Sequence, residues 1–128
     1  MKIRNIAVIG ATGSVGRSAL EVCSLFPDLF RVRALAAERD VEGLLGLGRR
    51  FNSDLLVLAD QESSGRLCRM AGSEFACRGG EEALLSLVEE PICEEVVFAS
   101  SGTDALPALI QALQRGKKVY LANKEILV

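Results

Sequence analysis

Three glycines, Gly10, Gly13 and Gly16, recur at three-residue steps directly after the apolar run IAVI near the start of the chain. Where a strand turns into a helix, the first helical amides have no partner inside the helix, and the helix N-terminus carries about half a positive charge. An anion such as phosphate binds well at such a point. The spacing therefore predicts a phosphate-binding turn: Gly10 permits the turn, Gly13 lets the backbone approach the phosphate, and Gly16 lets the helix lie close to the strand.

The residues between the glycines favour the same chemistry. Thr12 and Ser14 add hydroxyl donors, and Val15 opens the helix that follows. The spacing is GxxGxxG rather than GxGxxG, which is compatible with a pyrophosphate but less selective as a pattern. A tight turn without a ligand is the alternative interpretation. Because the glycines follow a strand and open an amphipathic helix, we expect a dinucleotide site.

A charged turn, Glu38, Arg39 and Asp40, follows the second predicted strand. In dinucleotide-binding folds an acidic residue at this point binds the ribose diol, whereas a basic one accepts a 2′-phosphate. Arg39 could bind a phosphate through two hydrogen bonds, and the neighbouring carboxylates would repel it. A solvated turn with no ligand is the other interpretation, so the turn leaves the choice between NADPH and NADH open.

The residues Asn123, Lys124 and Glu125 follow the last predicted strand, at the edge where open α/β sheets bind ligands. Asn can orient an amide or a hydroxyl, Lys can meet an anionic or carbonyl oxygen, and Glu can accept a hydrogen bond from a ribose or hold the Lys. A helix cap with a surface ion pair is the alternative interpretation of this segment.

Apolar periodicity predicts the elements that position these residues. Short β-branched runs alternate with amphipathic segments of about ten residues, which is typical of βαβ crossovers and a mostly parallel sheet. The fold class is therefore α/β, a doubly wound sheet in three α/β/α layers. We expect strands at 3–9, 30–37, 55–59, 74–78, 95–99 and 117–122, and helices at 15–26, 41–51, 62–71, 81–89 and 104–115.

Composition bounds the remaining possibilities. The 128 residues are enough for one domain, residues 1–128, with a core of aliphatic side chains, because hydrophobic residues make up 49% and aromatic residues only 5%. The net charge of −2 and the scattered basic residues argue against nucleic acid as a partner. Four cysteines without a CxxC pair, and no histidine, indicate thiols rather than a zinc site. With no leader or membrane segment recognised, we expect a reduced, cytoplasmic protein.

The segments GATGSVG at 10–16 and GKKVYLANKEILV at 116–128 together resemble the N-terminal domain of the 1-deoxy-D-xylulose 5-phosphate reductoisomerase family. The resemblance extends over the whole chain, including FRVRALAA at 30–37 and LPALIQAL at 106–113. Members of this family are enzymes that use NADPH and a divalent cation, Mg²⁺ or Mn²⁺, to rearrange and reduce a sugar phosphate to 2-C-methyl-D-erythritol 4-phosphate in isoprenoid biosynthesis. The resemblance implies a Rossmann-like fold and a homodimer at full length.

The resemblance also implies roles for individual residues. Residues 12–15 would cradle the cofactor pyrophosphate, Asn123 and Glu125 would face the nicotinamide half, and Lys124 would contact the substrate. The charged turn departs from the family's usual Gly-Lys-Asn, so Arg39 is left as the basic partner of a 2′-phosphate. Because the metal-binding carboxylates of the family would lie beyond Val128, we expect no catalysis or metal binding by this segment alone. The apolar ending ILV at 126–128 favours a continuation of the chain over a natural terminus.

Other classes of protein share parts of the pattern. Aspartate-semialdehyde dehydrogenases also open with a GATG-type turn, but they need a cysteine thiolate, and Cys77 and Cys93 have no histidine to activate them. Homoserine dehydrogenases carry an ANK segment at the end of a strand. A nucleotide-sensing module without catalytic activity is the alternative outside the enzymes.

Overall fold

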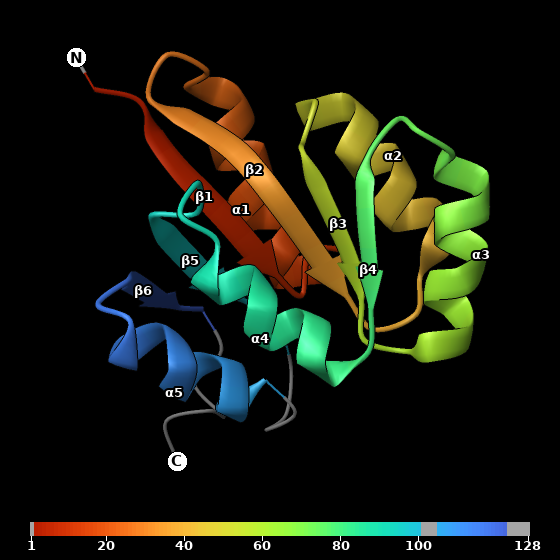
Figure 1. Ribbon diagram of the computed structural model, residues 1–128. Coiled ribbons are helices and arrows are strands. Elements are labelled where there is room, and N and C mark those ends of the chain that lie inside the picture. Colours follow the sequence, from red (N-terminus) through yellow and green to blue (C-terminus); the bar gives the residue numbers. More distant parts are fainter. Residues whose placement is uncertain (1, 101–104, 123–128) are drawn as a thin grey trace.

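One six-stranded parallel sheet organises the computed structural model, which describes residues 2–100 and 105–122 (Figure 1). Strands and helices alternate along the chain, with bounds close to those expected from apolar periodicity. The strands are β1 Arg4–Ile9, β2 Phe30–Ala37, β3 Leu55–Leu58, β4 Ala76–Gly79, β5 Glu95–Phe98 and β6 Lys118–Leu121. The helices are α1 Ser14–Leu25, α2 Val41–Phe51, α3 Gln61–Ala71, α4 Glu81–Glu89 and α5 Leu106–Gln114.

The strand order β4-β3-β2-β1-β5-β6 reverses direction at β1. The chain first builds outward from β1 to β4, then returns to pair β5 with the free edge of β1. Ile9 at the end of β1 lies in register with Ala36 of β2 on one side and Phe98 of β5 on the other. The carboxyl ends of β1, β2 and β5 therefore lie together at one sheet edge, at the switch point where doubly wound sheets bind ligands.

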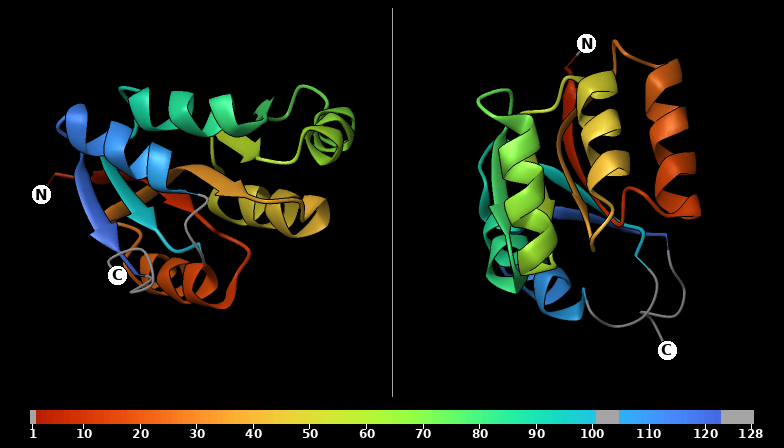
Figure 2. Two further views of the ribbon diagram at one scale, coloured as in Figure 1. Left: turned by 90° about the horizontal axis from the view of Figure 1, so that it is seen from below. Right: turned by 90° about the vertical axis from the view of Figure 1, so that its right-hand side faces the viewer.

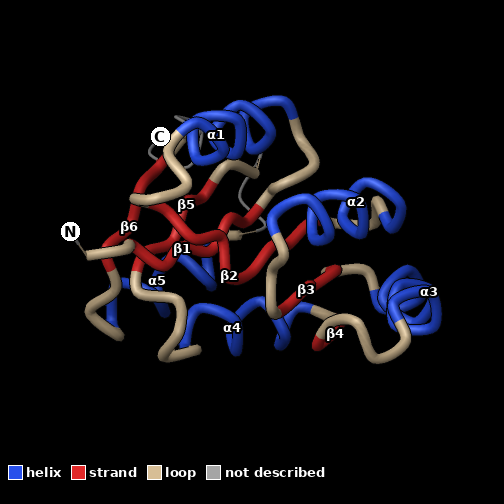
Figure 3. The backbone as a smooth tube through the Cα atoms, turned by 90° about the horizontal axis from the view of Figure 1, so that it is seen from above, coloured by secondary structure: helices blue, strands red, loops and turns tan. Residues whose placement is uncertain are grey.

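Helices cover both faces of the sheet, as Figures 2 and 3 show. α1, α2 and α3 pack on one face and α4 and α5 on the other, each over its own cluster of buried aliphatic side chains. Successive residues of β1 alternate between the two clusters, because a strand presents consecutive side chains to opposite faces. This confirms the three-layer, doubly wound α/β fold. No helix in the described ranges is long and apolar enough to cross a membrane.

The inward face of α1 differs from the one that its apolar residues predict. Val15 and Phe26 are the first and last apolar residues of the helix expected at 15–26, and they are 42% and 48% exposed. The residues that pack inward are Gly16, Leu20 and Cys23. The stripe begins at the glycine because the helix lies so close to β1 that no side chain fits there, and this rotates Val15 outward.

At the amino-terminal edge of the sheet, opposite the switch point, Arg4 joins four strands. Its Nε and Nη2 atoms donate to the two carboxylate oxygens of Glu95, at 2.8 and 2.6 Å, and Nη2 also donates to the hydroxyl of Tyr120. The guanidinium lies 5.1 Å from the ring centre of Phe30. Glu95 is buried, and the hydrogen bond from Arg4 lowers the pKa of its carboxyl group despite that burial. The cluster links β2, β1, β5 and β6.

Candidate functional site

The glycine turn after β1 is held by the end of the neighbouring strand β2. Gly10 has φ +85°, a backbone conformation that favours glycine, so the chain turns sharply as it leaves β1. The amides of Gly10 and Ala11 both donate to the carbonyl oxygen of Ala36, each at 2.9 Å. This shared acceptor fixes the turn against β2 before α1 begins at Ser14.

The three glycines occupy different surroundings. A β-carbon on Gly10 would lie 2.4 Å from the backbone nitrogen of Ser100, and one on Gly16 would lie 2.0 Å from the carbonyl oxygen of Gly10. Backbone atoms therefore fill the space beside these two residues. Gly13 is exposed, and its β-carbon would meet nothing closer than that same carbonyl oxygen, at 3.7 Å. Gly13 is the glycine whose open side can admit a ligand.

The amino end of α1 has no capping side chain and no acidic side chain to offset its partial positive charge. Gly13 occupies the cap position in an extended conformation without a side-chain capping bond, and the first turn holds no acidic residue. Ser14 and Val15 are exposed, and Thr12 is half-buried. The leading amides of α1 and its partial positive charge are therefore open to an anion from solvent.

The charged turn after β2 lies at the same edge, and its three side chains are exposed. Asp40 caps α2 by accepting a hydrogen bond from the amide of Gly43 at 2.9 Å, a structural role that was not predicted from the sequence. The pKa of Asp60 is lowered mainly by hydrogen bonds from Ser63, and the charge of Arg39 adds to this. Arg39 is therefore a solvent-facing cation near the ends of β2 and β3.

Arg17 connects the two turns, and sequence analysis did not single it out. Its Nε donates to the carbonyl oxygen of Thr12 at 3.0 Å, and its Nη2 lies 4.0 Å from Oδ2 of Asp40. The side chain leans back over the start of its own helix, as long helical side chains do. The sequence did offer one signal for Arg17: it follows the third glycine directly, which places a cation on the first turn of the helix beside the predicted phosphate site.

The third predicted group follows β6 in the sequence. The amide of Ala122 donates to the carbonyl oxygen of Phe98 at 2.9 Å, so the chain reaches the switch-point edge beside β5. Asn123, Lys124 and Glu125 follow directly, but they lie outside the described residues.

Cys93 and Cys77, the two thiols that a semialdehyde dehydrogenase would need to activate, show no sign of an activated nucleophile. Burial raises the pKa of Cys93 to about 11, with the nearby Lys117 opposing the shift. Burial also raises the pKa of Cys77 to about 11. Both thiols are therefore protonated at neutral pH. In the described part of the chain, no three His, Cys, Asp or Glu side chains gather in a way that could hold a metal ion.

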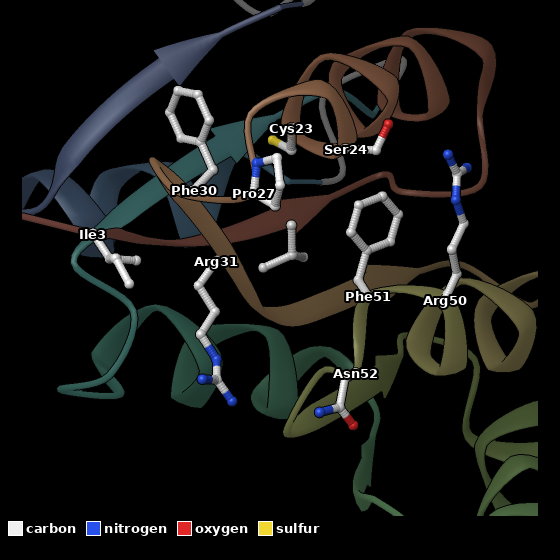
Figure 4. Close-up of a pocket in the computed structure, with 10 residues that line it drawn as sticks. Ile3, Cys23, Ser24, Pro27, Phe30, Arg31, Arg50, Phe51 and Asn52 are labelled. Carbon is white, nitrogen blue, oxygen red and sulfur yellow. The ribbon is translucent and has the colours of Figure 1, made fainter.

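A pocket of about 390 Å³ lies at the opposite edge of the sheet, between the carboxyl ends of α1 and α2 (Figure 4). Phe30, Phe51 and Pro27 contribute apolar walls, and Arg50, which also lines it, pairs with Glu21 at 2.5 Å. Helix carboxyl ends carry partial negative charge, so this pocket does not favour phosphate. The glycine turn is the better candidate site, because its backbone donors lie at the switch point.

The sequence matches a protein-family model described as 1-deoxy-D-xylulose 5-phosphate reductoisomerase over residues 6–128. A reductoisomerase from Bradyrhizobium sp. (strain ORS 278) is 40% identical over 127 residues, and one from Chlamydia trachomatis serovar D is 39% identical over the same length. Each alignment covers 98% of this chain but only 31% and 33% of the relative. The chain thus spans about a third of the length of the curated relatives that it matches.

Solved structures agree with the sequence matches. The reductoisomerase from Zymomonas mobilis in complex with NADPH superimposes with a TM-score of 0.90 at 35% identity, over 98% of this chain and 33% of that one. A reductoisomerase in complex with NADPH, fosmidomycin and magnesium gives the same TM-score at 30% identity, over 98% and 31% of the two chains.

Proposed function

Because this chain belongs to the 1-deoxy-D-xylulose 5-phosphate reductoisomerase family, we propose that it is the N-terminal, NADPH-binding domain of a longer enzyme that rearranges and reduces 1-deoxy-D-xylulose 5-phosphate. One observation carries the proposal. Gly13 leaves open space beside the uncapped start of α1, at the switch-point edge of the sheet, where the last residue of β1 is in register with the last residue of β5. The relative from Zymomonas mobilis, with the same fold, is described in complex with NADPH.

The described residues fit such a cofactor. Thr12, Gly13, Ser14 and Val15 offer backbone amides and hydroxyl groups to the pyrophosphate. Arg39 binds the 2′-phosphate, since its guanidinium is exposed and can donate two hydrogen bonds. Glu38 and Asp40 flank the adenosine ribose. Bound NADPH supplies the hydride, while these residues hold and orient its phosphates.

Arg17 extends this assignment. Its guanidinium stands between the turn that ends at Thr12 and the charged turn at Asp40, each of which it contacts. A dinucleotide that passes from one turn to the other runs beside this cation. We assign to Arg17 an electrostatic contact with the cofactor phosphates, which Arg39 supplements at the ribose end.

The substrate half of the proposal rests on residues 123–125. Asn123 and Glu125 face the nicotinamide half, and Lys124 meets an oxygen of the sugar phosphate, as the family resemblance implies. The divalent cation, Mg²⁺ or Mn²⁺, is held by residues of the longer enzyme, since one relative is described in complex with magnesium. The longer enzyme is a cytoplasmic homodimer that acts on a small molecule. Neither nucleic acid nor a membrane is among its proposed partners. These parts of the proposal rest on the same resemblance.

The other classes of protein have less support. A semialdehyde dehydrogenase requires a thiolate beside the nicotinamide, whereas the pKa values of Cys77 and Cys93 are raised to about 11. The relatives that align with 98% of this chain include reductoisomerases from Bradyrhizobium and Chlamydia. A non-enzymatic sensor would bind the same nucleotide, so it differs from the proposal only in activity of the longer protein.

Gly13→Val tests the cofactor site directly. The backbone of Gly13 is extended, at φ −76° and ψ 170°, and its side is open, so valine fits the fold but occupies the space that a pyrophosphate needs. We expect calorimetric titration to show NADPH binding by the wild-type chain and none by the variant, with unchanged circular dichroism. Gly46→Ala, on the exposed side of α2, is the matched control and should bind as wild type does. Equal binding by Gly13→Val would overturn the site.

A further inference from the structure

α3 and the edge strand β4 pack against each other and lie side by side in Figure 1, and each of them carries one cysteine. Gly79 fixes the alignment of the two elements, because a β-carbon on it would lie 1.8 Å from the hydroxyl oxygen of Ser64. α3 lies between the parallel strands β3 and β4 in the chain, so it runs antiparallel to both. One helical turn onward from Ser64 is Cys68, and two residues back from Gly79 is Cys77.

These two steps have nearly the same length, about 6 Å along the helix and about 6.6 Å along the strand. Both steps also keep to one face of their element. Cys68 therefore lies opposite Cys77, just as Ser64 lies opposite Gly79. The raised pKa of Cys77 agrees with this placement, because its causes after burial are the charge of Cys68 and a hydrogen bond with it.

The pair is open to small reagents. Cys68 and Cys77 are half-buried, and among the described residues β4 has β3 as its only strand neighbour. The remaining cysteines differ in both respects: Cys23 and Cys93 are 8% and 0% exposed and belong to the cores on opposite faces of the sheet. The fold thus brings one pair of thiols together at an accessible edge and keeps the other two apart.

We propose that Cys68 and Cys77 form a reversible dithiol–disulfide site that small-molecule disulfides such as glutathione disulfide oxidise. The Cys68 thiolate attacks one sulfur of glutathione disulfide, a Cys68–glutathione bond forms, and one glutathione leaves and takes up a proton. Cys77 then loses its proton to solvent and attacks the Cys68 sulfur, which releases the second glutathione. In sum, two cysteine thiols are oxidised to one disulfide, and one glutathione disulfide is reduced to two glutathiones.

The disulfide fastens α3 to the edge of the sheet. In the part of the chain that the structure describes, β4 pairs with no strand except β3, so a covalent link to α3 gives this edge strand a second attachment. This site lies away from the glycine turn and does not depend on the proposed cofactor. Its test can therefore fail while NADPH binding stands, and the reverse also holds.

Redox titration of the native chain tests the proposal. The chain is equilibrated with glutathione and glutathione disulfide at varied ratios, quenched with acid, alkylated and digested with trypsin. Cleavage after Arg66, Arg69 and Arg78 places Cys68 and Cys77 on separate peptides, so their disulfide joins 67–69 to 70–78. We expect this linked pair to form while Cys23 and Cys93 are alkylated. In the urea-unfolded chain the equilibrium constant for the same link should fall by about tenfold or more, because the thiols are no longer held together.

Variants define the two chemical steps. Cys68→Ser and Cys77→Ser should each stop at a mixed disulfide with one glutathione, whereas Cys23→Ala, the control, should still form the internal link. Circular dichroism confirms that each variant is folded. The proposal is overturned if the folded wild-type chain carries only mixed disulfides or free thiols at these two positions across the whole titration. It is also overturned if unfolding leaves the equilibrium constant of the link unchanged.

Discussion

The β-carbon position of Gly16 lies 2.0 Å from the carbonyl oxygen of Gly10, so α1 and the end of β1 touch backbone to backbone. The first glycine turns the chain and the third lets the helix return against it. Between them, Gly13 is left facing solvent. The same three-residue spacing thus produces two positions filled by packing and one open position for a ligand.

Gly16→Ala should destabilise the fold. A methyl group at this position overlaps a backbone oxygen that is itself fixed by the turn at Gly10, and overpacking of this kind costs about 1–3 kcal/mol. Urea denaturation measures the loss. Gly46→Ala is the matched control: nothing lies within 4 Å of its β-carbon position, so alanine should stabilise α2 by about 0.5–1 kcal/mol. Equal stability of Gly16→Ala and wild type would show that the helix can move away.

Arg39→Ala should discriminate between the two nicotinamide cofactors. Loss of a charge-assisted hydrogen bond to the 2′-phosphate, about 1.5–3 kcal/mol, should weaken NADPH binding by about tenfold to a hundredfold. NADH lacks that phosphate, so its dissociation constant should change little. Calorimetric titration with both cofactors gives the comparison. If NADH binding weakens equally, Arg39 does not contact the 2′-phosphate.

Arg17→Met should weaken both cofactors. Methionine keeps much of the apolar stem of Arg17 but removes the guanidinium that lies between Thr12 and Asp40. Because the pyrophosphate is common to NADPH and NADH, we expect both dissociation constants to rise by a similar factor, about three- to tenfold for a half-exposed cation. Dependence on salt should decrease in the variant. A loss confined to NADPH would instead place Arg17 at the 2′-phosphate.

Glu95 should make the free energy of unfolding depend on pH. The pKa of Glu95 in the folded chain is lowered, chiefly by the hydrogen bond from Arg4. Ionised Glu95 therefore stabilises the fold at pH values above the pKa that it has in the unfolded chain. This contribution is lost as the pH falls through its lower pKa in the folded chain. Glu95→Gln should lower the free energy of unfolding at pH 7 by about 1–2 kcal/mol. Between about pH 5 and pH 3 the difference from wild type should shrink.

Glu94→Gln is the matched control for Glu95. The carboxylate of Glu94 pairs with Lys2 at 3.4 Å on the surface, and 41% of the Glu94 side chain is exposed, so water and salt screen the interaction. Urea denaturation across the pH series should show a clearly smaller change for this variant. If the two variants behave alike, burial of Glu95 adds nothing to its pairing with Arg4.

Local signals in the sequence predicted most of the architecture. Strands and helices could be placed because apolar periodicity depends on the packing of each element against the sheet. The inward face of α1 could not, because it depends on the close approach of Gly16, which periodicity assigns to no face. Asp40 carried a usable signal, since Asp directly before a helix is a common cap. The contact from Arg17 to Asp40 depends on tertiary structure and had no such signal.

The ion pair between Arg4 and Glu95 joins neighbouring strands whose residues are 91 positions apart in the chain. During synthesis β1 can pair with β2 soon after both leave the ribosome, but its other edge has no partner until β5 is complete. At about 5–20 residues per second that interval lasts roughly 5–20 s. Throughout that interval the nascent sheet exposes the edge of a strand whose last four residues are buried in the finished core. This makes the half-made chain a natural client for chaperones that shield unpaired strands.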